Sequence, residues 1–424
     1  MKKFVKIQLG SFINLITDYH ANGSYKVLKS NIQIKYKPDY AIMIRTLNFE
    51  QNDFTNDLIY IDEHAYNFLS KSIVMPNDIL INKIANPGNI YLMPDINKKV
   101  SCGMNLFLIR FDNKVNQIYM YYNLKSNEKK LKKLAHGTTT KTITKDDIRD
   151  FEIIMHHDVS TQNIIAYLLY YIDKSIELKY KINSELEQMA KTLYNYWFIQ
   201  FDFPDENGRP YKSSGGKMVW NEELKKEIPE CWEVENLANN SISSIIPVGI
   251  EYFNKKNYLE TKNINNELIS DGAWISYDNR ENRANMQPEL NSIWFAKMQK
   301  SIKHITLPSN SQWFIDKYIL STGFFGLKCS KDALSYIHCF INSKYFENKK
   351  NTLAHGATQK AVNNQDLERI PLIIPPTNLL KAFNSKIYNL LEMKLNIIKT
   401  NQELTSLRDF LLPLLMNGQA VIRE

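Results

Sequence analysis

The chain repeats part of its own sequence, and this internal duplication constrains its fold more than any other feature. At an offset of 219 residues, 11 positions of the 25-residue window 123–147 recur without a gap in 342–366. The first copy holds Asn123, Lys125, Glu128, Lys130, Leu134, Ala135, His136, Gly137, Thr139, Lys141 and Asp147. The second copy holds Asn342, Lys344, Glu347, Lys349, Leu353, Ala354, His355, Gly356, Thr358, Lys360 and Asp366. Composition alone does not produce such a match, so both halves are predicted to contain the same structural unit.

Each copy is predicted to contain a helix, a loop and a strand in the same order. A lysine-rich segment has helix-forming composition and is predicted to end at Gly137 or Gly356, because glycine tolerates the left-handed C′ position. A polar loop and a short apolar run, predicted to be a strand, follow in both copies. The helical segments are 123–135 and 342–354, and the strands are 151–155 and 370–374. Further strand-like runs are 74–80, 101–111 and 312–329.

Beyond each strand, apolar residues recur seven positions apart, which is typical of a coiled-coil helix. The first series is Ile165, Ile172, Lys179, Leu186 and Leu193, and the second is Phe383, Leu390, Ile397, Leu404 and Leu411. A complementary seam is assigned to Leu168, Ile182, Met189, Met393, Leu407 and Leu414. Forty residues make a rod of roughly 60 Å. Neither rod is expected to leave its apolar stripe in water, and the simplest partner for each is the other.

These patterns predict an α+β protein with two similar globular parts. The predicted divisions are a globular domain at 1–156, a helix at 157–200, a linker at 201–230, a second globular domain at 231–376, and a helix with a C-terminal tail at 377–424. Proline, glycine and serine clusters predict a linker without helix or sheet of its own.

Several classes of protein and of site are disfavoured. No run approaches the roughly 18 apolar residues of a membrane span, and Met1–Lys6 lacks a signal-peptide pattern. The four cysteines lack zinc-ligand spacing and fit a reducing compartment, so a cytoplasmic location is expected. His156 and His157 align with Pro375 and Pro376, which argues against a metal site. They are interpreted as a strand end, with Asp158, Ser160 and Thr161 as N-cap residues of the following helix.

No catalytic constellation is found. His136 and His355 recur without a serine or cysteine nucleophile beside them. Two interpretations remain open for these histidines, a helix C-terminal dipole partner and a contact to phosphate or base edges. No glycine-rich loop for a nucleotide or for S-adenosylmethionine is present, so we expect no cofactor or metal on this chain.

The charge distribution favours a DNA partner. The formal charge is +8, and residues 125–149 carry eight Lys/Arg against three Asp/Glu. Lysines neutralise phosphates, while hydroxyl and amide side chains read base edges. The candidate DNA-binding residues are Lys83, Lys130, His136, Gly137, Thr138, Thr139, Thr140 and Lys141 in the first half, and Lys297, Lys349, His355, Gly356, Thr358, Gln359 and Lys360 in the second.

At these residues the chain resembles the DNA-specificity subunits of Type I restriction–modification systems. The resemblance rests on the Gly-x-Thr loops, on the helix ending 183–194, and on the run 197–220 with its Phe-Asp-Phe-Pro and Ser-Ser-Gly-Gly segments. The family's overall plan covers the whole chain. Two departures occur: His156-His157 replaces a usual proline pair, and Cys231 stands where glycine commonly precedes tryptophan.

The resemblance implies a non-catalytic subunit with two target-recognition domains that read a bipartite double-stranded DNA sequence. Two antiparallel helices are implied to space the domains, so shortening one by a heptad is expected to change the spacer before the half-sites. The implied partners are two methyltransferase subunits, which use S-adenosylmethionine, and ATP- and Mg-dependent restriction subunits. Tyr194, Tyr196 and Trp197 are assigned either to partner binding or to core packing.

Two other functions fit the same sequence. One is the recognition module of a Type II-like system, whose catalytic domain lies on another chain; co-purified partners distinguish it. The other is a coiled-coil scaffold for proteins, which salt-dependent DNA binding excludes.

Overall fold

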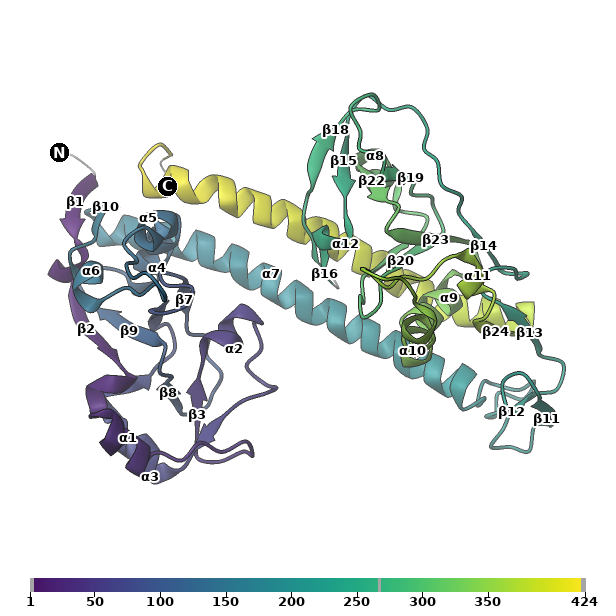
Figure 1. The fold of residues 1–424 in the computed structure, drawn as a ribbon, viewed down its shortest axis with the longest axis horizontal. Helices are drawn as coiled ribbons and strands as arrows, with labels where there is room; N and C mark the ends of the chain where they lie inside the picture. Colours follow the sequence, from purple (N-terminus) through teal and green to yellow (C-terminus); the bar gives the residue numbers. More distant parts are fainter. Residues whose placement is uncertain (1–3, 266–267, 421–424) are drawn as a thin grey trace. The chain divides into compact units, whose positions relative to one another are not determined.

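The computed structural model describes residues 4–265 and 268–420, which form two compact units (Figure 1). The first unit contains the described residues up to Ser175 and those from Thr405 onward, and the second spans Ile176–Leu404. Residues 1–3, which entered the signal-peptide prediction, and 421–424 of the predicted tail lie outside the described residues. Within the described ranges, no helix is both long and apolar enough to cross a membrane.

The first unit contains two four-stranded sheets and a two-stranded ladder. One sheet is antiparallel with the order β2-β9-β6-β7, and the other has the order β4-β3-β8-β5 with β3 and β8 parallel. In the ladder, β1 pairs antiparallel with β10. The strands are β1 Phe4–Gln8, β2 Ile13–Asp18, β3 Ala41–Ile44, β4 Tyr60–Ile61, β5 Ile73–Val74, β6 Ile79–Asn82, β7 Ile90–Leu92, β8 Val100–Cys102, β9 Leu106–Phe111 and β10 Glu152–His156. The helices are α1 Tyr25–Asn31, α2 Thr46–Glu50, α3 Glu63–Phe68, α4 Gln117–Ser126, α5 Glu128–Lys132, α6 Lys145–Arg149 and the start of α7 Val159–Tyr194.

The second unit has the same sheet orders. An antiparallel sheet runs β14-β23-β20-β21, a mixed sheet runs β18-β15-β22-β19 with β15 and β22 parallel, and β13 pairs with β24. The strands are β11 Met218–Asn221, β12 Lys226–Pro229, β13 Glu233–Asn236, β14 Ser243–Ile245, β15 Lys256–Leu259, β16 Ile264–Asn265, β17 Leu268–Ile269, β18 Ala273–Ile275, β19 Ala284–Met286, β20 Ser292–Ala296, β21 His304–Leu307, β22 Tyr318–Ser321, β23 Phe324–Cys329 and β24 Pro371–Ile374. The helices are α8 Gln312–Lys317, α9 Leu334–Ile341, α10 Lys344–Leu353, α11 Asn364–Leu367 and most of α12 Thr377–Met416.

The duplication therefore extends upstream of the matched window, into the described residues of 4–120 and 235–340. Within 4–265 and 268–420, both units have the same strand order and one parallel pair each in the mixed sheet, although the matched window begins only at residue 123. Three expectations were wrong in detail. Residues 312–317 form α8 instead of a strand, the 201–230 linker contains the β11–β12 hairpin, and the lysine-rich segment 123–135 is split between α4 and α5, whereas 342–354 contains one helix, α10, as predicted.

The two long helices lie antiparallel where they meet. In the second unit, Asn183 of α7 donates to the Lys394 carbonyl of α12, while Asn401 of α12 donates to the Ile176 carbonyl of α7, both at 3.5 Å. In the first unit, Arg408 pairs with Asp173 at 2.7 Å. Asp173 also accepts a hydrogen bond from Tyr122 of α4, which ties the helices to that unit's core.

The predicted heptad positions and the complementary seam have different outcomes. Of the heptad positions, Ile165, Ile172, Leu186 and Phe383 are buried and Leu193, Leu390, Ile397, Leu404 and Leu411 are partly buried. Of the predicted seam, Leu414 is partly buried, but Leu168, Ile182, Met189, Met393 and Leu407 are exposed, so the seam was otherwise wrong; the buried seam of α7 is Leu169, Ile176, Asn183 and Ala190. The buried seam lies one residue after the predicted one because residues on one face of a helix are spaced alternately three and four positions apart.

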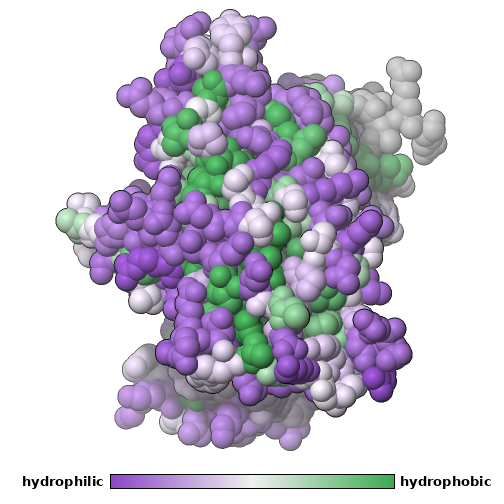
Figure 2. Space-filling view, turned by 90° about the vertical axis from the view of Figure 1, so that its right-hand side faces the viewer, coloured by the Kyte–Doolittle hydropathy of each residue, from purple (hydrophilic) through white to green (hydrophobic). Residues whose placement is uncertain are grey.

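Hydrophilic side chains cover most of the molecular face in Figure 2, with apolar side chains showing between them.

An aromatic cluster forms part of the core of the second unit at the end of α7, where a π-helical turn spans Asn195–Ile199. Trp197 packs on Phe383 with ring centroids 5.6 Å apart, and Tyr194 is buried in the same cluster. These two residues are therefore core residues, whereas Tyr196 is exposed. Phe203 of the linker stacks on Trp232 at 5.1 Å, which fixes the linker against the core.

Candidate nucleic-acid interface

Each unit presents an exposed loop that is closed at its base by a pair of backbone hydrogen bonds. In the first unit, His136 and Thr142 exchange bonds of 2.9 and 2.8 Å; in the second, His355 and Ala361 exchange bonds of 3.1 and 3.0 Å. The residues at the loop tips are exposed: Gly137, Thr138, Thr139, Thr140, Lys141, Gly356, Ala357, Thr358, Gln359 and Lys360. The sequence-predicted candidates of each loop are thus brought together.

The two glycines are required by the loops and do not serve as helix C′ residues. Gly137 has φ +113° and Gly356 has φ +135°, in the region that disfavours side chains. A Cβ atom on Gly137 would lie 2.5 Å from the Thr140 carbonyl oxygen, and one on Gly356 would lie 2.6 Å from that of Gln359. Because α5 and α10 end at least two residues earlier, the predicted C′ role was wrong.

Each recurrent histidine lies between a helix end and a capping carboxylate. Nδ1 of His136 is 3.3 Å from the Leu134 carbonyl oxygen and 3.7 Å from Asp147. Nδ1 of His355 is 3.3 Å from Asp366 and contacts the matching carbonyl. Asp147 and Asp366 form capping boxes at the starts of α6 and α11. The Leu353 carbonyl is the last of α10, which agrees with a helix-end role for His355, whereas Leu134 lies two residues beyond α5; a DNA contact stays a prediction for both rings.

Lys83 and Lys297 occupy equivalent places beneath the two loops. The Lys83 carbonyl accepts from Ile143, and the Lys297 carbonyl accepts from Val362, at 3.0 and 3.1 Å. Each ammonium group lies over an aromatic ring, Phe107 for Lys83 at 5.4 Å and Phe325 for Lys297 at 4.2 Å. Burial lowers the pKa of Lys297.

The remaining predicted candidates differ in their present partners. Exposed Lys130 donates to the Asn127 side chain, and exposed Lys349 lies 5.8 Å from the Tyr345 ring. The Gln359 amide donates to the Met298 sulfur at 2.6 Å, so it does not point freely outward as a base reader requires.

A buried charged cluster in the second unit escaped the sequence analysis. Lys350 is fully buried and donates to the carbonyl oxygen of Ser301 at 2.9 Å and to Glu347 at 2.7 Å. Glu347 also contacts His304 at 3.1 Å. Burial favours the protonated form of Glu347, but His304 and Lys350 outweigh it and hold the pKa of the carboxyl below its ordinary value.

This cluster holds the segment that supports the second loop. The backbone of Gln299 donates to the Lys360 carbonyl at 2.9 Å, and its side chain donates to the Asn351 carbonyl at 2.7 Å. The sequence does contain a sign of this cluster, because Lys350 aligns with the apolar Leu131 of the first copy. A charged residue at a position that is apolar in the other copy indicates a buried charge.

The two departures from the family pattern have local explanations. His156 ends β10, and Asp158 caps α7 by accepting from the Thr161 backbone at 2.8 Å, as predicted for an N-cap residue. Among the described residues, no group of three or more His, Cys, Asp or Glu side chains is arranged to hold a metal ion. Cys231 has φ +71°, a conformation that glycine adopts without strain.

Comparisons with known proteins agree with this arrangement. Residues 1–188 match the family described as the Type I restriction modification DNA specificity domain. The chain is 27% identical over 325 residues to the Type I restriction enzyme MjaIX specificity subunit of Methanocaldococcus jannaschii, covering 72% of this chain and 69% of the relative. It is 24% identical to the putative type I restriction enzyme MjaX specificity subunit of the same organism, covering 94% and 92%.

The fold is also similar to that of a solved structure. The crystal structure of a Type-I restriction-modification system S subunit from M. genitalium has a TM-score of 0.57 and 16% identity, with 97% of this chain and 96% of that chain covered. The predicted α+β fold class and the resemblance to Type I specificity subunits are confirmed.

Proposed function

We propose that this chain, which is similar to the Type I restriction–modification specificity subunits, reads a bipartite double-stranded DNA target. The observation that carries the proposal is the repeated loop, seated in the same way in two units of the same strand order. Two similar readers on one chain suit a target made of two half-sites with a fixed separation. The two loops differ in sequence, for example Thr138 against Ala357, and such differences then give the half-sites different sequences.

Each loop carries side chains of the types that bind double-stranded DNA. Lys141 and Lys360 are exposed, which supports a role in neutralising phosphates; such contacts position a protein without reading sequence. Threonine hydroxyls in both loops and the nearby histidines provide donors and acceptors for base edges. Small residues at the loop tips allow the backbone to approach a phosphate closely.

We propose that α7 and α12 space the two readers and bind the partners. Exposed apolar residues on the second-unit part of α7, Leu178, Ile182 and Met189, offer a surface for methyltransferase subunits. In this proposal the chain itself is not catalytic. Those subunits use S-adenosylmethionine, and the restriction subunits use ATP and Mg, in the cytoplasm where the chromosome lies.

The test is DNA binding by the chain in complex with its methyltransferase subunits. Selection from a random duplex library is expected to yield two short constant sequences separated by a gap of constant length. Alanine at Lys141 and Lys360 is expected to weaken binding and to reduce the salt slope by about one per lost phosphate contact. Alanine at exposed Lys114 and Lys225, one in each unit, is the matched control. An unchanged affinity and slope in the loop variant would show that the loops do not contact DNA.

A further inference from the structure

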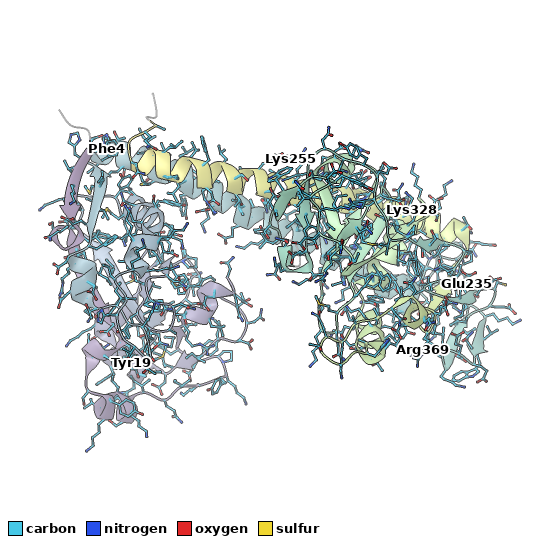
Figure 3. All side chains as sticks on the ribbon, turned by 45° about the horizontal axis from the view of Figure 1, so that its top comes forward. Phe4, Tyr19, Glu235, Lys255, Lys328 and Arg369 are labelled. Carbon is cyan, nitrogen blue, oxygen red and sulfur yellow. The ribbon has the colours of Figure 1, made fainter. Side chains whose placement is uncertain are left out.

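Two lysines in the first unit converge on one buried carboxylate beneath the 136–142 loop. Asp18 ends β2, next to Tyr19, which is labelled in Figure 3. Its two oxygens accept from Lys83 at 2.7 Å and from Lys145 at 2.8 Å. The Asp18 side chain is 9% exposed, while those of Lys83 and Lys145 are 16% and 29% exposed.

The three residues connect the loop to the sheet from both sides. Lys83 carries the backbone carbonyl to which the residue after the loop, Ile143, is bonded. Lys145 is the first residue of α6, which follows the same loop. Both ammonium groups also lie over the Phe107 ring, at 5.4 and 5.9 Å. Two long flexible side chains are thereby held in one place at the base of the loop.

The charges of this cluster do not cancel. Burial opposes ionisation of Asp18, but the hydrogen bonds from Lys145 and Lys83 outweigh it and hold the pKa of the carboxyl below its ordinary value. One carboxylate faces two ammonium groups, which leaves one positive charge in excess. Each ammonium group has three donors, so both retain donors for a second anion.

The equivalent positions of the second unit, all of them described, do not form this arrangement. At the offset of 219, Lys145 corresponds to Asn364, and Lys297, the equivalent of Lys83, lies over Phe325. The cluster of Asp18, Lys83 and Lys145 is therefore a difference between the first unit and the second.

We propose that Asp18 is a positioning residue that holds Lys83 and Lys145 together as a receptor for a DNA phosphate at one half-site. This inference rests on the proposed DNA-reading function and adds a site to it. The carboxylate does not contact DNA. Because Asp18 already holds both lysine side chains in place, they lose less conformational entropy when they bind a phosphate than two free lysines would. The bound phosphate then fixes the position of the first loop relative to the base edges.

The test uses a substitution for which simple electrostatics and positioning predict opposite results. Asp18→Asn removes a negative charge from a basic surface, so simple electrostatics predicts tighter binding to all DNA. Positioning predicts that affinity for the specific duplex falls about tenfold, the order of one lost specific contact, while non-specific affinity stays equal or rises. Asp146→Asn is the matched control. Asp146 is exposed on the same helix as Lys145 and forms an ion pair with Arg149, so its replacement changes the charge by the same amount without touching the cluster.

The measurement is the dissociation constant of the complex with methyltransferase subunits, for specific, half-site-altered and non-specific duplexes over a range of salt. The expected result is that Asp18→Asn lowers discrimination at one half-site only, and that Asp146→Asn does not. If Asp18→Asn behaves like Asp146→Asn, or weakens all duplexes in proportion, the positioning role is refuted.

A second variant keeps the test decisive if Asp18→Asn does not fold. Lys145→Gln leaves the Asp18–Lys83 pair in place and is expected to reduce the salt slope by about one. An unchanged slope in Lys145→Gln would refute the phosphate receptor. If the unaltered complex shows no preference for a bipartite duplex, the proposed function itself fails, whatever the variants do.

Discussion

Replacement of Lys350 by methionine is expected to destabilise the second unit strongly. Methionine keeps most of the side-chain volume but removes the ammonium group, which donates to Glu347 at 2.7 Å and to the Ser301 carbonyl at 2.9 Å. Removing one partner of a buried ion pair costs about 3–5 kcal/mol, and an orphaned buried carbonyl costs about 1–3 kcal/mol. Because these losses overlap, we expect a decrease of about 4 kcal/mol in the free energy of unfolding.

Chemical and thermal unfolding of the whole chain measure this decrease. For a unit of this size, about 4 kcal/mol corresponds to a fall in Tm of roughly 8–16 °C for the transition of the second unit. Leu131→Met is the matched control, since Leu131 is the apolar counterpart of Lys350 in the first unit and a volume-conserving exchange costs less than about 1.5 kcal/mol. Glu347→Gln added to Lys350→Met is expected to recover part of the loss, because no unpaired carboxylate remains. A loss below about 1 kcal/mol, or strict additivity in the double variant, would refute the assigned cluster.

Three further predictions concern other parts of the chain. Cys231→Gly is expected to raise the free energy of unfolding by about 0.5–1 kcal/mol, because glycine relieves the left-handed strain at φ +71° and loses part of the gain to backbone entropy; a lower Tm contradicts this. Deleting 176–182 together with 395–401 removes one matched heptad, about 10 Å, from each long helix. The spacer between the two DNA half-sites is expected to shorten by about three base pairs while the half-sites stay unchanged. If mapping of the methylated sites returns the original spacer length, the two helices do not set that length. Burial opposes ionisation of Glu187, but His338 and Lys394 outweigh it and hold the pKa of this carboxyl below its ordinary value. The stabilisation that Glu187 provides is therefore complete above about pH 5 and declines by about 1.4 kcal/mol per pH unit below about pH 4. The free energies of unfolding of Glu187→Gln and of the unaltered chain, measured in urea, should converge in acid, and a difference that stays constant with pH would contradict this.

The elements that the sequence predicted are those whose signals are local. The repeated loops, the strands after them and the heptad helices all follow from residues close together in the chain. Helix α12 ends at Met416, two residues after Leu414, the last residue of the predicted seam. The loop glycines were identified as positions of positive φ, although the loop, and not a helix end, requires it.

The parts that the sequence did not predict depend on contacts between distant residues. The shared strand order of the two units arises from pairings such as β3 with β8, which no local pattern reveals. The seam of α7 was misplaced because Asn183 and Ala190 carry no hydrophobic signal, although both are buried. Asp18 and Lys145 are 127 positions apart, so their contact had no signature in the chain.

The most direct test of the central claim is a map of methylated adenines in a genome that expresses this chain with its methyltransferase partners. We predict one bipartite motif, with two constant half-sites and a non-specific gap of a single length. Exchange of the 355–361 loop for 136–142 is expected to alter one half-site and leave the other in place. A continuous motif without a gap, or methylation that does not depend on this chain, would contradict the account.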